Sequence, residues 1–199
     1  MESHLTVLLP LAAVWLAAGW LADGLPRLDH ARALRRRTGW VLALTLAGLG
    51  LTAAVLVAGL SSAGATAADR AAAGLGLAAA PALVVAASTV RRMRRLRAGA
   101  GALASAPGTP APYGLRAAAG HPLVGLPVQV TGLTILPAVV TASSPGLPFG
   151  PGATGAAITV GVLGVAAIGV RHALRHSRLV ERATPARPAS PRAASPLHV

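Results

Sequence analysis

Two histidines, His172 and His176, have the spacing of a metal-binding pair on a helix. Residues four apart lie on one face, and imidazole is a good ligand for zinc. No Asp, Glu or Cys lies near enough to complete such a site, and the chain contains no cysteine at all. Disulfides, thiolate catalysis and iron–sulfur ligation are therefore excluded. We expect no metal site and no cofactor.

A second polar group lies in an otherwise apolar stretch and consists of Gln129, Thr131 and Thr134, with prolines nearby. Proline removes a backbone hydrogen bond and frees a carbonyl, which small polar side chains can satisfy. Gly125, Gln129 and Gly132 share one helix face. One interpretation is a helix–helix contact in which Gln129 hydrogen-bonds across a close approach. The other is a kinked helix that lines a substrate route. We favour packing.

Four arginines near the C-terminus form a stripe. With spacings of 4, 3 and 4 residues they fall within about 60° of one another on a helix; they are Arg171, Arg175, Arg178 and Arg182. Such a stripe suits anionic lipid headgroups, at about 1 kcal/mol per arginine near the surface. A solvated helix face is the alternative.

Five further arginines occupy seven positions between Arg91 and Arg97, directly after twenty uncharged residues. In a soluble protein this run would suggest a nucleic-acid patch. After an apolar span it is better explained as the anchor that fixes the orientation of a membrane helix, so nucleic acid is not favoured as a partner. The helix should continue through the run with one side, formed by Thr89, Met93, Leu96 and Ala100, either packed or resting on the membrane.

The elements that must position these groups are long apolar stretches. Hydrophobic residues make up 54% of the 199 positions and charged residues only 12%. About 20 apolar residues cross the hydrocarbon core of a bilayer. Five stretches without any charged residue or histidine approach this length: Leu5–Ala22, Trp40–Leu60, Ala71–Val90, Pro122–Ala142 and Ala153–Val170. A soluble helical protein would need polar helix faces, which these lack. The sequence predicts an all-α, multi-pass transmembrane bundle over residues 1–182.

The arginines set the expected orientation. Seventeen of the eighteen fall in segments on one side of the five-span arrangement, and only Arg70 falls on the other. The positive-inside rule then places the N-terminus outside and the C-terminus in the cytoplasm, with Trp20 and Trp40 at the inner interface. Asp23 lies at the inner end of the first span, where we expect a structural pairing with Arg27. Residues 183–199 are rich in Pro and Ser and are predicted to be a disordered cytoplasmic tail.

The sequence contains no nucleotide-binding or hydrolase motif and no ionisable residue at mid-membrane depth. We therefore expect a non-enzymatic structural or accessory subunit of a membrane assembly, which contacts the lipid bilayer and partner proteins through small-residue helix faces. Such faces occur at Thr45, Gly48 and Thr52, and at Ala153, Ala157 and Gly161. The alternative is a small permease or exporter component whose fourth span lines the route. Arginine without lysine, among abundant Ala, Gly and Pro, suggests a GC-rich bacterial genome and hence the bacterial plasma membrane.

Overall fold

The computed structural model describes residues 5–61, 67–106, 108–143 and 151–184. Within these ranges the chain is helical and contains no strand, as the all-α prediction required. The elements are α1 (Leu5–Asp23), the short 3-10 helix η1 (Leu25–Arg27), α2 (Ala31–Ser61), α3 (Ala67–Val84), the π-helical turn η2 (Val85–Thr89), α4 (Val90–Leu103), α5 (Tyr113–Ala119), α6 (Pro122–Ser143) and α7 (Pro151–Ala183).

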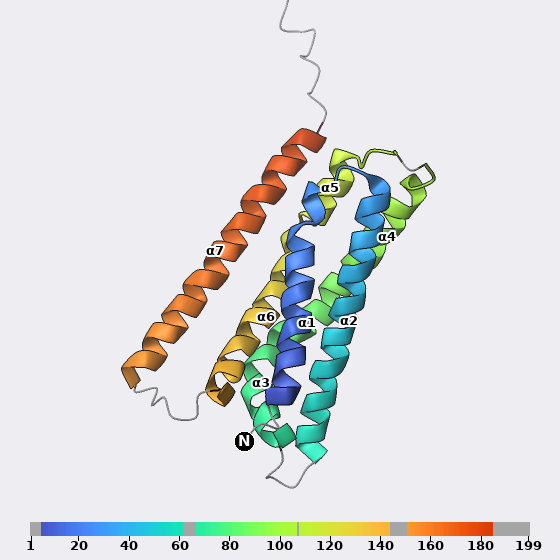
Figure 1. Cartoon of the computed structure of the whole chain (residues 1–199). Coiled ribbons are helices and arrows are strands. Elements are labelled where there is room, and N and C mark those ends of the chain that lie inside the picture. Colours follow the sequence, from blue (N-terminus) through green and yellow to red (C-terminus); the bar gives the residue numbers. More distant parts are fainter. Residues whose placement is uncertain (1–4, 62–66, 107, 144–150, 185–199) are drawn as a thin grey trace, which may run out of the picture.

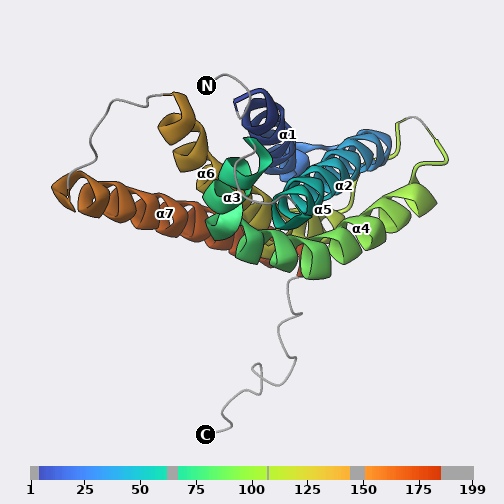
Figure 2. The ribbon, with the colours of Figure 1, turned by 90° about the horizontal axis from the view of Figure 1, so that it is seen from below.

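Helix α1 packs against α2 on one side and against α6 on the other (Figure 1). Helix α3 fits between α2 and α6, and α4 continues from it along α2. Helix α7 lies at the edge and contacts α5 and α6 (Figure 2). The core is built from small and aliphatic side chains, with Trp15 as its largest fully buried residue.

One side of α2 faces the interior of the bundle, where it contacts both α1 and α4. A line of buried positions in steps of three and four follows this side of the helix; it consists of Ala31, Leu34, Thr38, Val41, Thr45, Gly48 and Thr52, and Leu42 beside it is buried as well. The indole of Trp15 lies against Gly48, and its Nε1 donates to Thr52 Oγ1 at 3.2 Å. The small-residue face predicted in the second span is therefore a contact within the chain. Trp15 therefore packs across to α2.

Helices α3, η2 and α4 form one continuous rod. The π-helical turn places the hydroxyl of Thr89 2.7 Å from the carbonyl oxygen of Leu123 on α6. That carbonyl lacks its usual helical donor, because residue 127 is a proline. Beyond the turn, the predicted side of α4 is buried and all five arginines from Arg91 to Arg97 are exposed. The packed continuation of the helix is confirmed.

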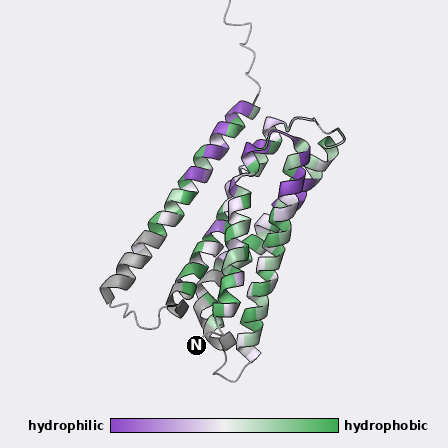
Figure 3. Cartoon of the chain, viewed as in Figure 1, coloured by the Kyte–Doolittle hydropathy of each residue, from purple (hydrophilic) through white to green (hydrophobic). Residues whose placement is uncertain are grey.

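Polar residues gather at one end of the bundle, where α1 ends and α2 begins (Figure 3). This end contains the basic segments from Arg27 to Arg37 and from Arg91 to Arg97, Arg116 and the last turns of α7. Trp20 and Trp40 lie there with most of their surface exposed, and the guanidinium of Arg37 stacks 5.5 Å from the Trp20 ring centroid. At the opposite end, the first turns of α1 and the last turns of α2 are mostly apolar (Figure 3).

Three stretches of the described chain are long and apolar enough to cross a membrane: Leu5–Arg27, Ala31–Gly59 and Tyr113–Leu136. They correspond to the first, second and fourth predicted spans. The third and fifth predicted spans are helical in α3, η2 and α7. Side chains at many of their positions lie outside the description, including those of Ala153, Ala157 and Gly161 in the predicted contact stripe. The predicted tail lies outside it from residue 185, as does the loop at 144–150.

Candidate functional site

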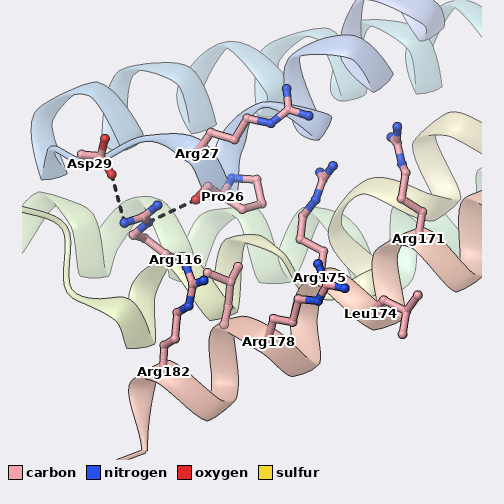
Figure 4. A pocket seen from close by; sticks show the side chains of 10 residues that line it. Pro26, Arg27, Asp29, Arg116, Arg171, Leu174, Arg175, Arg178 and Arg182 are labelled. Carbon is pink, nitrogen blue, oxygen red and sulfur yellow. Dashed lines mark hydrogen bonds and ion pairs between the residues drawn. The ribbon is translucent and has the colours of Figure 1, made fainter.

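A cavity of about 540 Å³ opens at the basic end, between η1, α5 and the last turns of α7 (Figure 4). Six arginines line it, together with one carboxylate and three apolar residues; they are Arg27, Arg116, Arg171, Arg175, Arg178, Arg182, Asp29, Pro26, Leu174 and Leu179. All four arginines of the predicted stripe therefore face one space. Its volume lies within the range of about 300–1,000 Å³ that is typical of small-molecule sites.

Asp23, the last residue of α1, bonds three of the arginines that line this cavity. Its carboxylate forms ion pairs with Arg171 and with Arg175, the latter at 3.0 Å, and a longer one of 3.4 Å with Arg27. The side chain is only 16% exposed. A carboxylate at a helix C-terminus faces the negative end of the helix dipole, so the three guanidinium groups offset an unfavourable position. The pairing expected with Arg27 is present, and the stronger partners come from α7.

Arg116 lines the cavity from α5 and bonds the segment between α1 and α2. Its Nη1 lies 2.9 Å from Asp29 Oδ1, and its Nε donates to the backbone carbonyl of Pro26 at 3.1 Å. These bonds tie α5 to the segment between α1 and α2. Arg178 and Arg182, by contrast, make no ion pair with any residue that the structure describes. Two of the six cations thus face the cavity without a carboxylate.

Gln129 lies deeper and joins three helices. Its Nε2 donates to the carbonyl of Gly19 on α1 at 3.3 Å, and its Oε1 accepts from His172 Nε2 on α7 at 3.0 Å. Two glycines allow this approach: a Cβ on Gly19 would lie 3.1 Å from Gln129 Cγ, and one on Gly125 would lie 2.7 Å from the His172 ring. This geometry supports the packing interpretation of Gln129.

The two threonines beside Gln129 act within their own helix. Thr131 donates to the carbonyl of Pro127 at 2.8 Å, and Thr134 donates to that of Thr131 at 2.9 Å. Neither side chain lines a described cavity. The structure therefore does not bring Thr131 and Thr134 together with Gln129 in one site.

A second cavity, of about 450 Å³, runs past Gln129 between α1, α6 and α7. Its lining is mostly apolar and includes Leu16, Trp20, Leu133, Ala167 and Ile168. Arg171 lines this groove as well as the arginine-lined cavity. The two spaces therefore meet at that side chain.

Both histidines of the pair make hydrogen bonds to neighbouring helices. His172 is 4% exposed and bonds Gln129, and His176 Nδ1 donates to the carbonyl of Ala117 on α5 at 3.0 Å. Burial lowers the pKa of His172, Arg171 and Arg175 lower it further, and only Asp23 acts in the opposite direction. Within the described ranges no three His, Cys, Asp or Glu side chains come together as a metal site.

Two residues gained importance only from the structure, namely Asp23 as a hub for α7 and Trp15 as a link to α2. Neither partner could be found from local spacing, since Asp23 and Arg175 are 152 residues apart. No family model, curated protein or solved structure matches this chain.

Proposed function

We propose that the chain is an integral protein of the bacterial plasma membrane with five transmembrane helices, an external N-terminus and a cytoplasmic C-terminus. The support is the charge distribution: the arginines whose side chains the structure describes gather at one end, and three helices have the length and apolarity to span. Under the positive-inside rule the basic end faces the cytoplasm. Helices α3 with η2, and α7, supply the third and fifth spans.

Within that membrane the protein acts as a non-enzymatic structural or accessory subunit of a larger assembly. The observation that carries this proposal is an exposed apolar stripe on α7. Leu163, Val170 and Leu174 have 63%, 58% and 54% of their surface exposed, at spacings of seven and four residues. Lipid tails could cover the first two, but Leu174 lies beyond Arg171, where the apolar span has ended, and borders the arginine-lined cavity. An exposed leucine at headgroup depth is better covered by a partner protein.

The bonding of the inner polar groups supports the same proposal. Trp15, Thr89 and Gln129 each hydrogen-bond a neighbouring helix. Thr38 is a described exception, because its buried hydroxyl has no partner. Such groups stabilise a bundle and leave little for acid–base chemistry.

A photo-crosslinking amino acid at Val170 tests this function in cells that express the chain naturally. We expect a discrete adduct with a second protein, and a tagged chain that migrates with that protein in native electrophoresis. The matched control is Val57, which is 61% exposed on α2, and which should give no such adduct. Adducts to lipid alone, together with a chain that migrates as a monomer, would contradict an accessory role.

The groove beside Gln129 favours a second candidate, a small permease or exporter component in which α6 lines the route. In that case Gln129→Leu would change the flux of a substrate and leave the stability of the bundle unchanged. An effect on stability, by contrast, favours the accessory subunit.

A further inference from the structure

We propose that the arginine-lined cavity and the apolar groove are the two halves of one binding site for an anionic diacyl phospholipid. The phosphate lies among the arginines of α7, α5 and η1, and an acyl chain lies in the groove between α1, α6 and α7. The site rests on the membrane placement proposed above. This proposal is more specific than a general attraction of basic residues to acidic lipid, because it places one lipid molecule at a defined position in the fold.

The charges around the cavity call for an anion. Six guanidinium groups line it, and the only carboxylates bonded to them within the described structure are Asp23 and Asp29. These acids hold Arg27, Arg116, Arg171 and Arg175 in place. Arg178 and Arg182 are left facing the cavity, and a phosphodiester accepts the paired N–H groups of guanidinium well. A bound phosphate would also relieve the repulsion among the cations.

The position of the two spaces distinguishes a lipid from a soluble anion. Arg171 follows directly on the apolar residues of α7, and Asp23 follows directly on those of α1, so the arginine-lined cavity begins where both spans end. The groove occupies the adjoining depth of the spans, at Leu16, Leu133 and Ile168. A headgroup at the boundary with a chain pointing into the hydrocarbon follows this arrangement. Arg171, which lines both spaces, marks the junction between phosphate and glycerol.

The lipid would fasten α7 to the bundle. The cations that it joins come from three elements: Arg27 from η1, Arg116 from α5, and Arg178 and Arg182 from α7. Basic pockets between helices on the cytoplasmic side are a recognised mode of headgroup binding. In this protein the pocket and the adjoining groove would give the lipid both charge and shape recognition.

The test uses the full chain reconstituted in phosphatidylcholine nanodiscs with a trace of fluorescent phosphatidylglycerol, whose proximity to the protein is read by energy transfer from tryptophan. The headgroup variant is Arg178→Gln with Arg182→Gln, two exposed side chains without a described ion pair. Its control is Arg91→Gln with Arg94→Gln, at the same end but outside the cavity. The variant that tests the acyl-chain half of the site is Ala167→Phe, which fills the groove. Its control is Ala166→Phe, at the exposed neighbouring residue that does not line the groove.

We expect the parent to prefer phosphatidylglycerol over fluorescent phosphatidylcholine, and the headgroup variant to bind it about ten- to thirty-fold more weakly. The chain variant should also bind it several-fold more weakly, and both controls should match the parent. If the Arg91 and Arg94 control lost as much phosphatidylglycerol binding as the headgroup variant, binding would depend on general surface charge and the site would be refuted. Unchanged binding by Ala167→Phe, with competition by glycerol phosphate, would replace the lipid by a soluble anion. A chain that alkali extracts from the discs would instead contradict the membrane placement itself.

Discussion

Arg175 on α7 and Asp23 at the end of α1 are 152 residues apart in the chain and are joined by a 3.0 Å ion pair. The same Nη1 group of Arg175 donates to the backbone carbonyl of Asp23, also at 3.0 Å. One guanidinium thus bonds both a side chain and an otherwise unsatisfied carbonyl at a helix end. This contact holds α7, which lies at the edge of the bundle, against the end of α1.

Replacing Asp23 should therefore loosen α7. Asp23→Asn leaves three arginines around a neutral group, and we expect the free energy of unfolding to fall by about 1–3 kcal/mol. Asp29→Asn is the matched control, because that carboxylate is 69% exposed and pairs with Arg116 alone; its effect should stay below about 1 kcal/mol. Unfolding of the purified protein in mild detergent measures both. Equal stability of the two variants would contradict the role of Asp23 in holding α7 against α1.

The seam between α1 and α2 predicts a sharp difference between two glycines. A methyl group on Gly48 would lie 2.8 Å from the Trp15 indole, whereas one on Gly50 would meet nothing within 4 Å. Gly48→Ala must displace the ring and its bond to Thr52, at an expected cost of about 1–3 kcal/mol. Gly50→Ala should be neutral or stabilising by up to about 1 kcal/mol, because alanine favours helix. The same detergent unfolding compares them, and a Gly48→Ala protein as stable as Gly50→Ala would refute the close packing.

Gln129 separates the two candidate functions. If its bonds to Gly19 and His172 hold three helices together, Gln129→Leu should lower bundle stability by about 0.5–2 kcal/mol. Thr134→Val is a suitable control, because that hydroxyl bonds only within α6. Stability can be measured before any substrate is known. A Gln129→Leu protein with the stability of the parent would favour the route-lining interpretation.

The buried His172 predicts a pH dependence. Because its pKa is lowered in the folded protein, the unfolded chain binds the proton first as the pH falls. The contribution of His172 is complete above the ordinary pKa of about 6.5 and is lost as the pH falls from there to the lowered value. Stability should therefore decline as the pH falls below about 6.5, and less steeply in His172→Gln. Thr134→Val, which removes no titratable group, should keep the slope of the parent; an identical slope in all three proteins would contradict the assignment.

The sequence predicted the features that repeat locally. The face of α4 formed by Thr89, Met93, Leu96 and Ala100 is buried as expected, and the arginine stripe of α7 lies on one helix that extends to Ala183. Helical periodicity is a local property, so both could be read from spacing. The cavity could not, because it needs Arg116 and Asp29 from elements distant in sequence. The link between Trp15 and Thr52 was hidden for the same reason, although the small residues of α2 indicated a helix contact at that position.

The proposed topology places the arginine-rich end of this membrane-spanning bundle in the cytoplasm. The chain has no cysteine, so single cysteines can be labelled without background by a thiol reagent that does not cross the membrane. In intact spheroplasts we expect labelling of Ser62→Cys and Pro148→Cys, and labelling of Ala106→Cys and Thr184→Cys only after lysis. Protection of Pro148→Cys until lysis would contradict the five-span arrangement.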